Sequence, residues 1–382
     1  MGINRKINWL ISFVIVFILA GVAFFSSREP VQNTPYVWPL PEGFPKPQIP
    51  ADNPITEEKI ALGRAIFYDK KLSFNGQQSC ATCHQQQFAF AEKQVRSIGS
   101  SGQQHRRNSP ALINIAYNKT LTWAHDGLTS LERQILLPMF GEEPIELGIT
   151  GHEEQILLHF NNADYQGLFA QAFPEQDVSF DLIVKALASF VRSLTSLNSP
   201  FDRYAYYGDD QALSPSALRG MNLFFSEKFE CHHCHGGFNF TQSTSHESQL
   251  IDRRPFHNTG LYNTEGNFSY PKEDLGLYEI SLNKADVGRF RAPTLRNIAV
   301  TAPYMHDGSI ATLAEVIDFY AAGGRVVENE MHQGDGRKNP LKSPFVKGFE
   351  LTTQDKQDLL AFLHSLTDQE FLTTQKHANP YK

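Results

Sequence analysis

The four cysteines of this 382-residue chain are confined to two short motifs. The first reads Cys80-Ala81-Thr82-Cys83-His84 and the second Cys231-His232-His233-Cys234-His235. Each is a C-x-x-C-H, the pattern typical of c-type haem attachment. In such a motif the two thiols bond to the haem and the adjacent histidine ligates the iron. The sequence therefore predicts two covalently bound haems, with His84 and His235 as iron ligands.

Two other interpretations of the paired cysteines fit less well. A four-cysteine zinc ribbon places its two pairs close in sequence, whereas these pairs lie in different halves of the chain. A thioredoxin-like redox pair does not require a histidine directly after each C-x-x-C. Within the second motif, we interpret His232 and His233 as spacers rather than iron ligands.

The N-terminus differs from the rest of the chain in composition. Arg5 and Lys6 precede an apolar run over residues 9–25, which lies between a signal-peptide core and a minimal membrane span in length. We therefore expect residues 1–28 to be a signal peptide or membrane anchor, with the run over 9–25 as a candidate membrane tether. The basic flank keeps this end in the cytoplasm, so we expect the remainder in the periplasm. The Pro-rich stretch 29–54 is predicted to be a tether that precedes the first domain.

The remaining chain is predicted to form two related, mostly α-helical domains at residues 55–197 and 198–382. Helical patterns are joined by long loops, and no segment alternates convincingly as a strand does. The net charge of −7 gives no support for nucleic-acid binding. Three pairs of similar segments indicate an internal repeat of a cytochrome c-like haem domain. The pairs are 62–74 with 218–229, 108–135 with 291–317, and 186–196 with 358–368.

The repeat also exposes a difference between the two halves. Thr312 and Glu315 have the spacing of a capping box, which predicts that a helix begins at residue 313. When the halves are aligned, one position of this helix carries Tyr320 in the second half and Pro138 in the first. A phenol oxygen can ligate ferric iron, as in catalase, whereas proline has no ligating atom. We therefore expect the iron of haem 1 to have an open coordination position. At haem 2, we expect Tyr320 to occupy that position.

These motifs resemble those of the bacterial di-haem cytochrome c peroxidase superfamily, in particular its MauG-like branch. The resemblance covers about residues 55–370 and includes "RNSPALIN", "LPMFGEEPIELG" and "RAPTLRNIAVTAPYMHDGS". Classical members carry methionine where Tyr320 stands, and MauG-like members carry tyrosine. The stretch "PMFGEEPIELG" looks closest to the MbnH-like enzymes, which are linked with copper-protein partners. Met305 and Met331 are alternative sixth ligands of haem 2, although we expect each to be a packing or loop residue.

The resemblance implies a distal pocket at haem 1. Gln134 and Glu146 match the family's distal glutamine and glutamate, and Pro138 matches its distal proline. A carboxylate beside the iron can move a proton from the inner to the outer oxygen of peroxide, which helps the O–O bond to break. Glu142 and Glu143 compete with Glu146 for this role, because the glutamate lies two residues further from the proline than is usual in the family.

A calcium site between the haems is also implied. It maps onto the side chain of Asn108 and the backbone carbonyls of Thr301 and Pro303. Hard oxygen ligands of this kind suit Ca²⁺, and ligands from both halves would lock the two domains together.

The family places a tryptophan between the haems as an electron relay. Trp123 is our candidate, because an indole can be oxidised transiently, although His125 stands closer to the family's position. Classical members also carry a histidine that ligates haem 1 until reduction releases it. Its expected place is Ser100 here. His105 lies nearby and can substitute, but we expect haem 1 to stay open without reductive activation.

The resemblance implies that hydrogen peroxide reacts at haem 1 and that haem 2 shares the oxidising equivalents. The protein would then oxidise a dedicated exported protein, as MauG-like enzymes do. One alternative is a cytochrome c peroxidase that removes peroxide with electrons from small redox proteins. The other is a di-haem electron carrier without enzyme activity, which Pro138 argues against because a carrier would close both irons.

Overall fold

The computed structural model describes residues 33–251, 254–266 and 269–382. The expected signal or anchor segment over residues 1–28, including the candidate tether 9–25, lies outside this range. Within the described residues, no helix has both the length and the apolar character needed to span a membrane. Residues 35–382 form one compact unit, and the following description concerns that unit.

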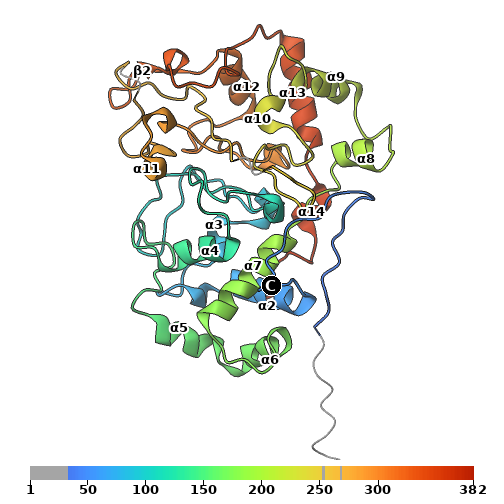
Figure 1. The fold of residues 1–382 in the computed structure, drawn as a ribbon, viewed down its shortest axis with the longest axis vertical. Helices are drawn as coiled ribbons and strands as arrows, with labels where there is room; N and C mark the ends of the chain where they lie inside the picture. Colours follow the sequence, from blue (N-terminus) through green and yellow to red (C-terminus); the bar gives the residue numbers. More distant parts are fainter. Residues whose placement is uncertain (1–32, 252–253, 267–268) are drawn as a thin grey trace, which may run out of the picture. The chain divides into compact units, whose positions relative to one another are not determined.

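Helices and long loops make up almost all of this unit, as the sequence predicts (Figure 1). The described strands are only β1 (Val326–Val327) and β2 (Gly334–Asp335), which pair antiparallel. The α-helices of the first half are α2 (Glu57–Tyr68), α3 (Cys80–Cys83), α4 (Leu131–Phe140), α5 (Glu153–Phe160), α6 (Ala163–Ala172) and α7 (Phe180–Ser193). Those of the second half are α8 (Pro200–Tyr206), α9 (Pro215–Phe224), α10 (His232–His235), α11 (Tyr278–Ser281), α12 (Leu313–Ala321), α13 (Thr353–Ser365) and α14 (Gln369–Thr373).

Short 3₁₀ turns connect these helices. They are η1 (Lys70–Leu72), η2 (Gln86–Phe88), η3 (Ile115–Tyr117), η4 (Lys284–Asp286), η5 (Ile298–Val300) and η6 (Gly336–Lys338).

Serine or threonine caps start most of the longer helices. The expected capping box of α12 is present, since the Thr312 hydroxyl accepts from the Glu315 amide and the Glu315 carboxylate accepts from the Thr312 amide. Helix α12 ends at Ala321, and Gly323 follows with a φ of +73°, a conformation that costs glycine little. The helix therefore begins at the residue that its sequence predicts.

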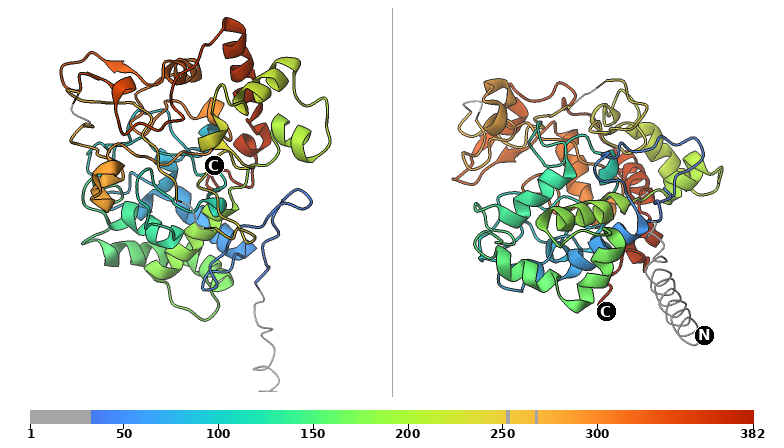
Figure 2. Two further views of the ribbon diagram at one scale, coloured as in Figure 1. Left: turned by 45° about the horizontal axis from the view of Figure 1, so that its top comes forward. Right: turned by 60° about the horizontal axis from the view of Figure 1, so that its bottom comes forward.

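Each half contains one pair of closely packed helices: α2 against α7, and α9 against α13 (Figures 1 and 2). A Cβ atom at Gly63 would lie 1.9 Å from the carbonyl oxygen of Ala186, and a Cβ at Gly220 would lie 1.9 Å from that of Asp358. Only glycine fits at such a distance. Ala186 and Asp358 occupy matching positions of the aligned segments 186–196 and 358–368.

A second contact also recurs in the two halves. The amide of Asn114 donates to the Leu194 carbonyl at 2.8 Å, and the amide of Asn297 donates to the Leu366 carbonyl at 2.9 Å. Both asparagines have left-handed backbones, with φ of 53° and 56°. Asparagine is among the residues that tolerate this conformation best. The contact therefore uses residues at matching positions of the aligned segments.

The two ends of the unit differ from the sequence expectation. The stretch 29–54 was expected to be a tether, but its described part packs on the protein: Tyr36 is buried in the core of the first half. Similarly, the expected second domain, 198–382, sends its C-terminus back to the first half. Phe371 and Leu372 join that core, and the Tyr68 hydroxyl donates to the His377 carbonyl at 2.7 Å. The physical reason in both cases is burial of apolar side chains within these segments.

The close helix contacts generate a stability prediction. Gly63→Ala and Gly220→Ala should each lower the free energy of unfolding by about 1–3 kcal/mol or more, because a methyl group forces the helices apart. The control is Gly167→Ala in α6, where a Cβ would meet nothing within 4 Å. This change should raise stability by roughly 0.5–1 kcal/mol. Denaturant unfolding measures all three, and tolerance of alanine at residues 63 and 220 would refute the packing argument.

Candidate haem sites and distal pocket

Two internal cavities each contain one of the C-x-x-C-H motifs. The first cavity is lined by Cys80, Cys83 and His84, and the second by Cys231, Cys234 and His235. The remaining walls of both are largely apolar side chains from the surrounding helices and loops. This is the environment that a large, flat and mostly apolar cofactor requires.

Both motif histidines are oriented by backbone carbonyls. The Nδ1 atom of His84 lies 2.7 Å from the Phe90 oxygen, and that of His235 lies 3.2 Å from the Phe240 oxygen and 3.1 Å from the Pro293 oxygen. Burial lowers the pKa of each imidazole to about 4, so both rings are neutral. A neutral ring that donates from Nδ1 keeps Nε2 as its free ligand atom.

The cysteines fit covalent haem attachment. All four are described, and none of them forms a disulfide. Burial raises the pKa of Cys80, Cys83 and Cys231 to about 12 and that of Cys234 to about 11, so the thiols are neutral. The two sites can therefore hold one haem each, through two thiols and one imidazole.

Each cavity is also lined by one arginine that the sequence analysis did not identify: Arg107 in the first and Arg291 in the second. Arg107 pairs with the Asp274 carboxylate through Nε and Nη2, both at 2.7 Å. Arg291 is buried, its Nε donates to the Thr122 carbonyl at 3.0 Å, and burial lowers its pKa to about 10. A buried guanidinium favours an anionic partner, which the carboxylates of a haem can provide.

The expected distal residues lie together in the first cavity. Gln134 and Pro138 stand one turn apart on α4, so they share a helix face, and Glu146 approaches from the following loop. The loop is held by hydrogen bonds from the Ser100 amide to the Glu146 carbonyl and from the Leu147 amide to the Pro138 carbonyl. These contacts place a carboxylate, an amide and a proline on one cavity.

Glu146 is the glutamate of this loop that lines the cavity, whereas Glu142 and Glu143 are exposed. Burial raises the pKa of Glu146 to about 7. The Nδ1 atom of His105 lies 3.8 Å from Glu146 Oε1, and burial lowers the pKa of this imidazole. The carboxyl group therefore changes its protonation state near neutral pH, beside an imidazole that is mostly neutral.

The second cavity contains Tyr320, which α12 places among the same wall residues as the cysteines of the second motif. Burial raises the pKa of its phenol well above the ordinary value, as do the nearby Cys234 and Cys231. Met305 also lines this cavity, but Met331 is 76% exposed and lies outside it. Tyr320 and Met305 are thus the two candidate sixth ligands that the fold brings to haem 2.

Trp123 lines both cavities, whereas His125 lines neither. The indole Nε1 donates to the Asn108 carbonyl at 2.8 Å, and the backbone carbonyl of Trp123 accepts from the Arg291 amide at 2.8 Å. Trp123 is thus held through its indole by a residue of the first half and through its backbone by a residue of the second half. His125 instead accepts a hydrogen bond from the Gly127 amide in its own turn.

The three residues of the expected calcium site line one small cavity next to Trp123. The side-chain nitrogen of Asn108 donates to the carbonyls of Gln94 and Val95, so its amide oxygen faces the other way. Together with the carbonyls of Thr301 and Pro303, this oxygen offers the neutral, hard ligands that suit Ca²⁺. No carboxylate of the described residues lines this cavity.

Comparisons with known proteins agree with this geometry. Residues 57–211 match the family described as di-haem cytochrome c peroxidase. The cytochrome-c peroxidase IdrP1 of Pseudomonas sp. (strain SCT) is 34% identical over 92% of this chain and 90% of its own length. The methylamine utilization protein MauG of Methylophilus methylotrophus is 32% identical over 88% of this chain and 92% of its own.

Solved structures point the same way. A crystal structure of a MauG-like protein associated with microbial copper homeostasis superposes with a TM-score of 0.88 and 45% identity, over 91% of this chain and 100% of that one. The di-haem peroxidase BthA from Burkholderia thailandensis E264 has the same fold, with a TM-score of 0.65 and 20% identity over 91% of this chain and 96% of that one. The chain belongs to the di-haem cytochrome c peroxidase and MauG family of oxidoreductases.

Proposed function

We propose that this protein reacts with hydrogen peroxide in its first cavity and uses the oxidising equivalents on an exported protein partner, as a MauG-type enzyme. The observation that carries the proposal is the difference between the two cavities. Pro138 lines the first without offering a ligand, while Tyr320 stands in the second with a phenol oxygen. A protein that only carries electrons does not need one iron with an open coordination position and one iron without.

His84 and His235 would hold one haem iron each, and these irons would supply the electron-transfer chemistry when the haems are bound. The chain's own distal residues manage the protons. Glu146 in its carboxylate form takes the proton of the inner peroxide oxygen and delivers it to the outer one, and Gln134 orients the peroxide by hydrogen bonding. The overall reaction converts H₂O₂, two protons and two electrons into two molecules of water, and the partner supplies the electrons.

Tyr320 and Trp123 are the residues that distinguish the proposed reaction from simple removal of peroxide. Tyr320 lines the second cavity and would ligate the iron of a haem held there, which would leave the first cavity for peroxide. Trp123 lines both cavities and can be oxidised transiently, which makes it the relay between them.

We also propose a Ca²⁺ ion at Asn108, Thr301 and Pro303. We further propose that the two halves are an internal repeat of one haem domain, which their matching contacts support.

The proposed partner is an exported protein. We place the reaction in the periplasm, on the basis of the N-terminal sequence. Because the MauG-like protein that is 45% identical is associated with microbial copper homeostasis, we propose that the partner is an exported protein of that setting. The relatives named cytochrome-c peroxidase favour a second candidate, in which small redox proteins donate the electrons.

The first test is the reaction of the as-isolated, fully oxidised protein with hydrogen peroxide. A MauG-type enzyme should react within the mixing time of a stopped-flow instrument, without prior reduction, and the absorption of both haems should change. Titration with a reductant should then recover two electron equivalents. A reaction that requires half-reduction first would favour the cytochrome c peroxidase, and no reaction in either state would favour an electron carrier.

The second prediction concerns pH. Because burial raises the pKa of Glu146 to about 7, the carboxyl is protonated below this pH and cannot accept the peroxide proton. The rate of the peroxide reaction should therefore rise through neutral pH and level off above it. Glu146→Gln should lower the rate by about 10²–10⁴-fold and abolish this pH dependence. Glu143→Gln, on the exposed part of the same loop, is the control that should retain both.

The third prediction concerns Tyr320. Tyr320→Phe removes the ligating oxygen, so the second haem should lose its phenolate ligand and the absorption changes should become confined to the first. Electron paramagnetic resonance of the oxidised protein reads the ligand change directly. Tyr304→Phe is the control, because this buried hydroxyl lies on the same cavity and donates to the Ile298 carbonyl at 3.0 Å. An unchanged resonance spectrum in Tyr320→Phe would refute the ligand assignment.

A further inference from the structure

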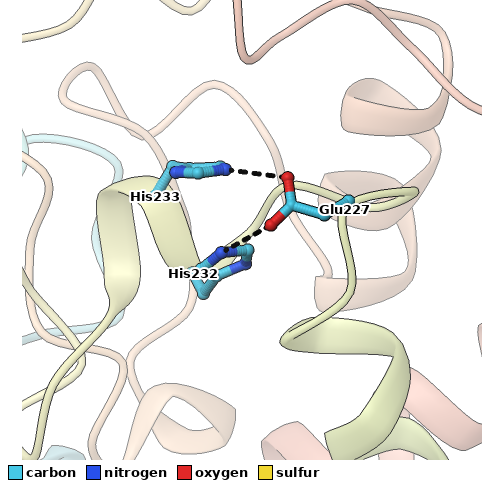
Figure 3. Close-up of side chains that lie close together, drawn as sticks. All are labelled: Glu227, His232 and His233. Carbon is cyan, nitrogen blue, oxygen red and sulfur yellow. Dashed lines mark ion pairs between the residues drawn. The ribbon is translucent and has the colours of Figure 1, made fainter.

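Helix α10 and the loop before it bring two imidazoles and a carboxylate together (Figure 3). His232 Nε2 lies 3.6 Å from one carboxylate oxygen of Glu227, and His233 Nε2 lies 3.5 Å from the other. The two imidazole rings lie side by side, with centroids 4.2 Å apart. One ligand atom from each of the three residues lies within 4.8 Å of the other two.

The distances of 3.6 and 3.5 Å between the imidazole nitrogens and the carboxylate oxygens are close to those of atoms that share a metal ion. Ligands about 2.1 Å from a tetrahedral metal lie roughly 3.4 Å from one another. A fourth group is available, because Glu230 Oε2 lies 2.7 Å from His233 Nε2, and Lys347 neutralises the other oxygen of Glu230 at 2.6 Å. Small side-chain rotations therefore suffice to close a shell of two nitrogens and one or two oxygens.

A haem in the second cavity would leave this cluster free. That cavity is lined by the two cysteines and His235 of the motif and by Glu230, but not by His232, His233 or Glu227. The carboxylate of Glu227 is 80% exposed, while the side chains of His232 and His233 are 23% and 28% exposed. Solvent ions can reach the cluster, and water can complete the coordination.

The first haem motif shows that attachment does not require these residues. Both motifs carry the same two cysteines and histidine, yet the groups of the cluster occur only in the second. The matching positions are His232 with Ala81, His233 with Thr82, Glu227 with Gly76 and Glu230 with Ser79. The second motif thus has four potential ligands beside it, and the matching positions of the first motif have none of them. This difference points to a function specific to the second half.

We propose that Glu227, His232 and His233 form a surface site for a late first-row divalent cation, next to the attachment motif of the second haem. Imidazole with carboxylate is a donor set that suits Cu²⁺ and Zn²⁺, and affinity in this series is highest for Cu²⁺. The site is separate from the haem irons and from the calcium site. It therefore stands whether or not the peroxide reaction is confirmed.

The test uses the full-length protein with both haems attached. Calorimetric titration with Cu²⁺, and separately with Zn²⁺, should give one site per chain, with Cu²⁺ binding tighter. The electron paramagnetic resonance of the bound Cu²⁺ should carry hyperfine structure from two imidazole nitrogens. Saturable binding of neither ion, or a Cu²⁺ spectrum without nitrogen coupling, would overturn the proposal.

The decisive variant combines His232→Ala with His233→Thr, which gives the second motif the spacers that the first motif already carries. Haem attachment should therefore be retained, as the haem absorption per chain will report. The affinity for Cu²⁺ should fall by at least about tenfold. His364→Gln, an exposed histidine of α13, is the control that should bind as the unaltered protein does. Undiminished affinity in the double variant would refute the site.

Discussion

The close packing of one helix pair in each half is the constraint on which the two cavities depend. Gly63 on α2 and Gly220 on α9 allow each helix to touch the backbone of its partner, at Ala186 and Asp358. Each C-x-x-C-H motif follows the glycine-bearing helix after a short loop, so this contact sets where the cysteines enter the cavity. A methyl group at either glycine would therefore disturb both the helix pair and the motif beyond it.

Burial then determines the chemistry of the groups that face the cavities. Desolvation keeps His84 neutral, the state in which an imidazole can ligate iron, and raises the pKa of Glu146 to about 7, so that its carboxyl can take up and release a proton near neutral pH. The same effect disfavours ionisation of Tyr320 in the protein alone. A ferric iron at the phenol oxygen would supply the positive charge that stabilises the phenolate. The functional groups are thus ordinary side chains whose properties depend on being enclosed.

Sequence and structure agree best where a prediction depends only on residues that are close together in the sequence. The C-x-x-C-H motifs, the capping box of α12 and the mostly helical character all depend on neighbouring residues, and each could be predicted. The packing of the chain ends could not be predicted from the sequence. Tyr36 and Phe371 lie in segments expected to be a tether and part of the second domain, yet both join the core of the first half. Which core an apolar residue joins depends on contacts between distant parts of the chain.

The sequence by itself determined the two attachment motifs and the difference between Pro138 and Tyr320, because covalent chemistry and ligand type belong to the residues themselves. Only the tertiary structure decided that Glu146, rather than its neighbours in the same loop, faces the first cavity, and that Trp123 lines both cavities. It also placed His232 and His233 opposite one carboxylate. The physical reason is that burial and distance arise only when separate segments fold against each other.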